Sequence, residues 1–153
     1  MTAEQQLIAL GLTLPSAPPR GGVYNPIVIV GNMAYVSGHG PYLGDGKYLT
    51  GRVGAELDLE AGKAAANQTA LALLATLKSE LGSLDRVKRV VKLLGMVNCP
   101  SDFADHPKVI NGYSELFGQI WGEEFGIGAR SAVGMGSLPG NIAVEIEGIF
   151  ELH

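Results

Sequence analysis

The segment from residue 130 to residue 152 carries the residues of this chain best suited to chemistry on a small acid. It reads RSAVGMGSLPGNIAVEIEGIFEL: Arg130 leads an apolar strand, an LPG turn follows, and Glu145 and Glu147 lie on a returning strand. A guanidinium is a rigid bidentate anchor for a carboxylate or phosphate, and a glutamate can move a proton or orient water. We predict that Arg130 and a glutamate share one cleft that binds a small organic acid. Such a pair can also be purely structural.

Caps, turn residues and hydrophobic periodicity predict the elements that position these residues. Thr2 and Gln5 form a capping box for a short N-terminal helix. Asp58 caps a long helix that Gly82 stops, and Pro107 suits the first turn of a second long helix. The expected helices cover 59–81 and about 107–122, and the expected strands lie within 23–38 (a hairpin turning at Gly31-Asn32), 87–99, 130–135 and 143–151.

Two long helices can cover only one face of such a sheet. Yet the stretches PIVIVG and VVKLLGMV are apolar on both faces, so the second face must also be buried, and self-association is the simplest way to bury it. We expect an α+β fold with an antiparallel-rich mixed β-sheet backed by two helices on one face, associating through its sheet edge or open face. The glycine-rich segment 40–56 is expected to be a mobile loop.

Composition excludes several classes of function. The length of 153 residues predicts one domain, and the net charge of −4 without a Lys/Arg run argues against a nucleic-acid surface. No apolar run is long enough to span a bilayer, and the N-terminus lacks the features of a signal peptide. The lone cysteine, Cys99, excludes an internal disulfide and predicts a cytoplasmic location. The histidines are too scattered to indicate a metal site.

Three segments, GNMAYVSGHGP, VINGYSELFG and ARSAVGMGSLPGNIAVEIEGI, occur in an order that resembles the Rid (reactive intermediate deaminase) family, also called YjgF-like or endoribonuclease L-PSP. The resemblance runs from about Val23 to Phe150, so we expect an N-terminal helix and Pro/Gly connector over 1–22 and one domain over 23–153. It implies a fold similar to the Bacillus-type chorismate mutase. Three copies would close a barrel, with active sites in clefts between subunits.

The resemblance also implies an activity and its residues. Members hydrolyse enamine and imine intermediates such as 2-aminoacrylate and 2-imino acids to 2-keto acids and ammonium, without a cofactor. Arg130 matches the arginine that grips the substrate carboxylate, and Glu145 matches the glutamate that positions the attacking water. Ala132 stands where the family has a cysteine, and its backbone carbonyl could still hold that water.

Four further positions match the family's pocket. Ser37 and Gly38 correspond to the SG motif, with the Gly38 N–H facing the bound carboxylate. Tyr24 corresponds to a tyrosine at the cleft, and Asn111 to an asparagine early in the second long helix. Three positions beyond that asparagine the family's aromatic residue is replaced by Ser114. Ser37 and Tyr24 are also compatible with purely structural roles.

Two other residues have competing interpretations. His39, which follows the SG pair, is either a general acid or, as we favour, a histidine bonded to backbone. Cys99, without an evident histidine partner, is expected to be a buried hydrophobe. For the whole protein, the alternatives to a hydrolase are a 2-keto acid binding module without catalysis and an RNA-cleaving translation inhibitor, against which the acidic charge argues.

Overall fold

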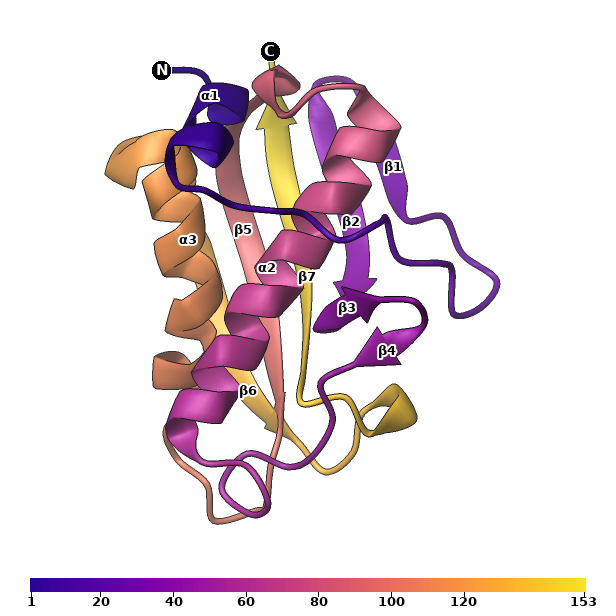
Figure 1. The fold of residues 1–153 in the computed structure, drawn as a ribbon, viewed down its shortest axis with the longest axis vertical. Coiled ribbons are helices and arrows are strands. Elements are labelled where there is room, and N and C mark those ends of the chain that lie inside the picture. Colours follow the sequence, from indigo (N-terminus) through magenta and orange to yellow (C-terminus); the bar gives the residue numbers. More distant parts are fainter.

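A computed structural model describes residues 1–153. A five-stranded sheet is covered on one face by two long helices (Figure 1). The helices are α1 (Ala3–Ala9), α2 (Leu59–Leu81) and α3 (His106–Gly126), and the strands are β1 (Ile27–Val30), β2 (Met33–His39), β3 (Tyr42–Gly44), β4 (Lys47–Tyr48), β5 (Val87–Asn98), β6 (Ala129–Met135) and β7 (Val144–Leu152). This is the predicted mixed sheet backed by two helices.

Helix boundaries follow local chemistry. The predicted capping box is present at the start of α1, and the Asp58 side chain accepts the Ala61 N–H at the start of α2. Gly82 ends α2 with a φ of 84°, a left-handed conformation that a glycine adopts without steric cost. Pro107 occupies the first turn of α3, as predicted, and Gly122, with φ 82° and ψ 166°, interrupts the helix where its end was expected.

The sheet order is β1-β2-β7-β5-β6, so the two strands of the 130–152 segment are not neighbours. Strand β5 lies between β6 and β7, pairing parallel with β6 and antiparallel with β7. The reason is the crossover through α3, which brings the chain back beside β5 in the same direction. The predicted cleft shared by Arg130 and a glutamate is therefore not formed by two neighbouring strands of one chain.

The core lies between the sheet and the helices. Along β7, Val144, Ile146 and Phe150 are buried under the helices, whereas the alternate residue Glu147 is exposed on the opposite face. Helices α2 and α3 touch closely at Gly112, where a Cβ would meet the backbone carbonyl of Lys63. The other face of the sheet is open, and no part of the chain covers it (Figure 1).

The N-terminal segment is fastened to this core. Ala3 and Leu7 of α1 are buried in the main core cluster. Glu4 accepts the Leu84 N–H at 2.9 Å and pairs with Lys78 at 2.9 Å. The connector after α1 then crosses over α2 to reach β1 (Figure 1).

The segment 40–56 is more regular than the expected mobile loop. It contains the hairpin of β3 and β4, with Tyr42 paired to Tyr48. Val53 is fully buried, and Arg52 Nη2 donates to the Cys99 carbonyl at 2.8 Å. Glycines permit the tight turns of this segment, and these buried contacts hold it against the domain.

Candidate active site

Arg130 is held by helix α3 on the helix-covered side of the sheet. Its Nη2 donates to Asn111 Oδ1 at 2.6 Å and to the Pro107 carbonyl at 3.1 Å, and its Nη1 donates to Ser114 Oγ at 3.1 Å. No carboxylate pairs with the guanidinium within the chain. We call Arg130, Asn111, Ser114 and Ala132 the arginine half. Neutral oxygens hold the Arg130 guanidinium in place and leave its positive charge unneutralised, so the guanidinium can bind an anion.

The environment of Arg130 favours a bound anion. Partial burial lowers its pKa, and the nearby Glu115 carboxylate opposes that shift. The guanidinium nonetheless stays protonated at any physiological pH. A half-buried cation that no carboxylate contacts is stabilised when a bound carboxylate replaces the water it has lost.

Glu145 lies on the open face of the sheet, beside Gly38. It alternates along β7 with the buried Val144 and Ile146, so its side chain points away from the helices. A Cβ at position 38 would collide with the Glu145 carboxylate. The β2–β7 register also shifts between Val36 and His39, which places an irregularity of the strand at Gly38. Glycine at position 38 thus makes room for the carboxylate.

The Glu145 carboxylate is shifted toward the neutral form. Burial raises its pKa, and repulsion from the Glu147 carboxylate on the same strand face raises it further. A glutamate with a raised pKa is a better proton acceptor once ionised than an ordinary surface glutamate.

Ser37 precedes Gly38 on β2, and Tyr24 lies in the segment that leads to β1. The Ser37 hydroxyl donates to the Asn25 carbonyl at 2.6 Å, which ties β2 to the segment that carries Tyr24. Tyr24 is 42% exposed, and its hydroxyl accepts the Gly21 N–H at 3.0 Å. We call Tyr24, Ser37, Gly38 and Glu145 the acid half. The Ser37 hydroxyl can still accept a hydrogen bond from a ligand, but its own proton is donated to the Asn25 carbonyl.

The two halves do not meet within one chain. Arg130 reaches α3 on the covered face, whereas Glu145 projects from the open face. Strand β5 separates their strands, so two strand spacings, roughly 10 Å, lie between the backbones. Arg130 is paired with Leu93 of β5, and Leu93 is paired with Gly148 of β7. Glu145 lies three residues before Gly148, so Arg130 and Glu145 are also offset by roughly 10 Å along the strands. A substrate with only a few carbon atoms cannot touch both halves of the same chain.

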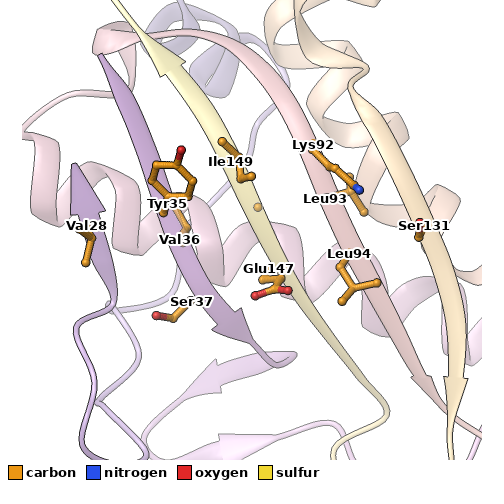
Figure 2. Close-up of a pocket in the computed structure, with 11 residues that line it drawn as sticks. Val28, Tyr35, Val36, Ser37, Lys92, Leu93, Leu94, Ser131, Glu147 and Ile149 are labelled. Carbon is orange, nitrogen blue, oxygen red and sulfur yellow. The ribbon is translucent and has the colours of Figure 1, made fainter. Parts of the chain in front are cut away.

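The open face carries a shallow hollow of about 440 Å³. Figure 2 shows Tyr35, Glu147 and Ile149 projecting into it from neighbouring strands, with Leu94 beyond them. Glu147 makes no ion pair within the chain. A largely apolar hollow over an uncovered sheet face has the character of a surface that another protein surface would bury.

His39 has a structural role. It is only 7% exposed, and its Nδ1 lies 2.7 Å from the Ser37 carbonyl while its Nε2 lies 2.7 Å from Thr76 Oγ1. The carbonyl can only accept, so Nδ1 carries the proton and Nε2 accepts from the threonine hydroxyl. Burial lowers the His39 pKa, and the bond to Ser37 opposes that shift. The favoured interpretation, a histidine bonded to backbone, is confirmed.

Cys99 has a neighbour that the sequence did not reveal. His106 Nε2 lies 3.6 Å from the Cys99 sulfur, seven residues on, across the turn between β5 and α3. The thiol is nevertheless 3% exposed, and burial raises its pKa. A protonated, enclosed thiol is a poor nucleophile, so Cys99 acts as a buried hydrophobe, as predicted.

The structure contains neither a metal-binding cluster nor a membrane-spanning helix. No group of three or more His, Cys, Asp and Glu side chains is arranged to hold a metal ion. None of the helices combines the length and the apolar character needed to cross a bilayer.

Comparison with known proteins identifies the family. The family described as YjgF/chorismate mutase-like, putative endoribonuclease, matches residues 4–143. Protein TCP17 of Trypanosoma cruzi is 42% identical over 144 residues, covering 94% of this chain and 90% of that protein. A putative endoribonuclease from Shewanella oneidensis MR-1 superposes with a TM-score of 0.93 at 34% identity, covering 99% of this chain and 100% of the other.

The chain therefore belongs to the YjgF/chorismate mutase-like family. RidA from the Antarctic bacterium Psychrobacter sp. PAMC 21119 is also similar, with a TM-score of 0.60 at 34% identity, over 90% of this chain and 94% of RidA. The predicted Rid relationship and fold class are confirmed. The lower TM-score with RidA than with the Shewanella protein is consistent with a divergent branch.

Proposed function

We propose that this protein hydrolyses 2-imino acids and their enamine tautomers, such as 2-aminoacrylate, to 2-keto acids and ammonium. The reaction would occur where the arginine half of one copy meets the acid half of a neighbouring copy. Family membership and the similarity to RidA support the reaction class. The composite site rests on the separation of Arg130 from Glu145 within each chain.

The proposed chemistry asks for an anchor, a positioned water and a route for protons. Arg130 binds the substrate carboxylate and thereby places the imine carbon. The ionised Glu145 accepts a proton from water as the water oxygen adds to the protonated imine carbon, which gives an adduct with one hydroxyl and one amino group on that carbon. Glu145 then returns the proton to the amino nitrogen. The C–N bond breaks as the hydroxyl oxygen forms the keto C=O, and the hydroxyl proton passes to the departing ammonia, which leaves as ammonium. No cofactor is required, because a protonated imine carbon is already electrophilic. Gly38, Ser37 and Tyr24 shape the pocket around the substrate.

Self-association follows from the same proposal. The open face exposes Val28, Tyr35 and Val133, and burying such side chains stabilises an assembly by about 25 cal/mol per Å² of apolar surface. We propose a homotrimer with its active sites in clefts between subunits, as the resemblance implies. Edge strands β1 and β6 leave backbone groups on one side without strand partners, and a neighbouring copy could pair with them.

A second candidate is a binding module that holds a 2-keto acid without turnover. It is favoured by one observation: the arginine half is fully assembled by α3 and β6 of a single chain. Such a module would need nothing from Glu145.

An imine-hydrolysis assay separates these functions. An amino-acid oxidase or threonine dehydratase generates the short-lived imine, and keto-acid release is followed with wild type, Arg130→Ala and the exposed control Arg20→Ala. Acceleration by wild type and Arg20→Ala, but not by Arg130→Ala, supports the hydrolase. Binding of 2-ketobutyrate in calorimetry without acceleration across several imines supports the module. Salt-sensitive RNA binding without either would contradict both.

A further inference from the structure

We infer that Ser114 is a positioning residue that fixes the plane of the Arg130 guanidinium and so sets the direction of substrate binding. This inference deepens the proposed function and rests on it. Ser114 lies in the middle of α3, and its hydroxyl oxygen accepts Arg130 Nη1–H at 3.1 Å.

Ser114 acts on a part of Arg130 that no other group restrains. Asn111 and the Pro107 carbonyl both accept from Nη2. Bonds at one nitrogen still let the planar group rock about that nitrogen, and a contact at a second nitrogen limits this motion. Ser114 provides that second contact.

The hydrogen-bond count shows what remains for a ligand. A guanidinium has five N–H groups, and three of them are used within the chain. The two that remain are Nε–H and one hydrogen on Nη1. Because Ser114 binds the other Nη1 hydrogen, it determines where the free Nη1–H points.

The local structure indicates that the Ser114 hydroxyl serves the contact with Arg130 and does not stabilise helix α3. Pro107, Asn111 and Ser114 recur at intervals of four and three residues, so they form one stripe of α3 facing Arg130. Serine is a weaker helix former than alanine by about 0.5 kcal/mol. Helical hydroxyls often bond back to the carbonyl four residues earlier, as Thr69 does to Ala65. Ser114 has Arg130 as its partner instead.

The test compares Ser114→Ala with Ser114→Thr, which keeps the hydroxyl, and with Ser79→Ala, the same change at an exposed position of α2. Removing one hydrogen bond should raise KM for the imine and Kd for 2-ketobutyrate by about 3- to 10-fold in Ser114→Ala, with kcat changed much less. Ser114→Thr should recover most of the affinity. The melting temperature of Ser114→Ala should stay the same or rise, as for Ser79→Ala, because alanine favours the helix.

A readout that does not need activity separates the inference from the proposed function. In protein labelled with ¹⁵N-arginine, a fixed guanidinium gives distinct Nη1 and Nη2 signals that exchange only when the group rotates about the Nε–Cζ bond. Because Ser114→Ala removes one of the three bonds that oppose this rotation, the exchange should be measurably faster in Ser114→Ala but not in Ser79→Ala. Unchanged Arg130 signals in Ser114→Ala would overturn the inference even if wild type is active. Faster exchange in Ser114→Ala together with an inactive wild type would support the restraint and reject the proposed reaction. Unchanged KM and Kd in an active Ser114→Ala enzyme would overturn the positioning role.

Discussion

Two inactive variants should restore activity to each other if the active site is built from two copies. Arg130→Ala destroys the arginine half of its own chain and leaves the acid half intact, and Glu145→Gln does the reverse. Each variant alone should lose activity, because removing one member of a hydrogen-bonded, half-buried charged site costs about 2–5 kcal/mol, tens to thousands of fold in rate. An assembly containing both chains should contain sites in which both halves are intact.

The size of the recovery follows from cyclic symmetry. In a trimer with both variants, whether two to one or one to two, a single interface pairs an intact Arg130 with an intact Glu145. The mixed assembly should therefore show about one third of wild-type activity. A site confined to one chain would give none, because every chain would carry one defect. Co-expression with two different affinity tags, followed by purification on both, isolates the mixed species for the imine-hydrolysis assay.

A matched control tests the assignment of residues to halves. Asn111 accepts from Arg130 at 2.6 Å and belongs to the same half, so Asn111→Ala mixed with Arg130→Ala should show no recovery. Mass spectrometry of the intact assembly confirms that both chains are present. If verified mixtures of Arg130→Ala and Glu145→Gln remain at the level of the single variants while wild type is active, the composite site is refuted.

Two further changes probe the acid half, and a third probes His39, which follows Gly38 on β2. Activity should fall as the pH drops through the raised pKa of Glu145, above the usual value of about 4.3 for a glutamate, and a rate that stays flat down to that usual value would contradict a catalytic role for its ionised form. Gly38→Ala should lower activity about ten-fold or more, because the added Cβ would collide with the Glu145 carboxylate and displace it. The control Gly136→Ala, whose Cβ meets nothing within 4 Å, should leave activity unchanged. Equal rates for the two variants would be inconsistent with the contact at Gly38. Burial lowers the His39 pKa, so the unfolded chain binds the proton more readily than the folded chain. The free energy of unfolding should therefore decline as the pH falls below about 6.5. In urea titrations His39→Gln should weaken this pH dependence, and an unchanged dependence would contradict the assignment to His39.

The elements of the fold were largely readable from local sequence. The Thr2/Gln5 capping box, Asp58 and Gly82 mark helix ends through hydrogen bonds and backbone angles set within a few residues. Runs of apolar residues located the strands, and apolar residues on both faces of those runs predicted a sheet face that the helices leave uncovered. The segment 40–56 contains a hairpin that was not predicted from the sequence, because its glycines are typical of a loop and the bond from the Val53 N–H to the Asn98 carbonyl joins distant parts of the chain.

The sequence named the candidate site residues one by one but not their arrangement. The structure places Arg130 in contact with Asn111, and Gly38 against Glu145. Their types and spacings suggested anchors and acids, since those properties belong to single side chains. The contact of Ser114 with Arg130 was not predicted, because this side-chain hydrogen bond joins residues on different elements.

The sequence by itself determined the kind of chemistry available, the helix ends and the apolar faces, because each depends on residue type and short-range geometry. Only the tertiary structure decided that β5 separates β6 from β7 and that Arg130 and Glu145 lie on opposite faces of the sheet. Strand order depends on how α3 crosses over the sheet, and side-chain facing depends on register. Strand order and side-chain facing are both set by packing between distant segments. Together they place the arginine half and the acid half of one chain apart from each other.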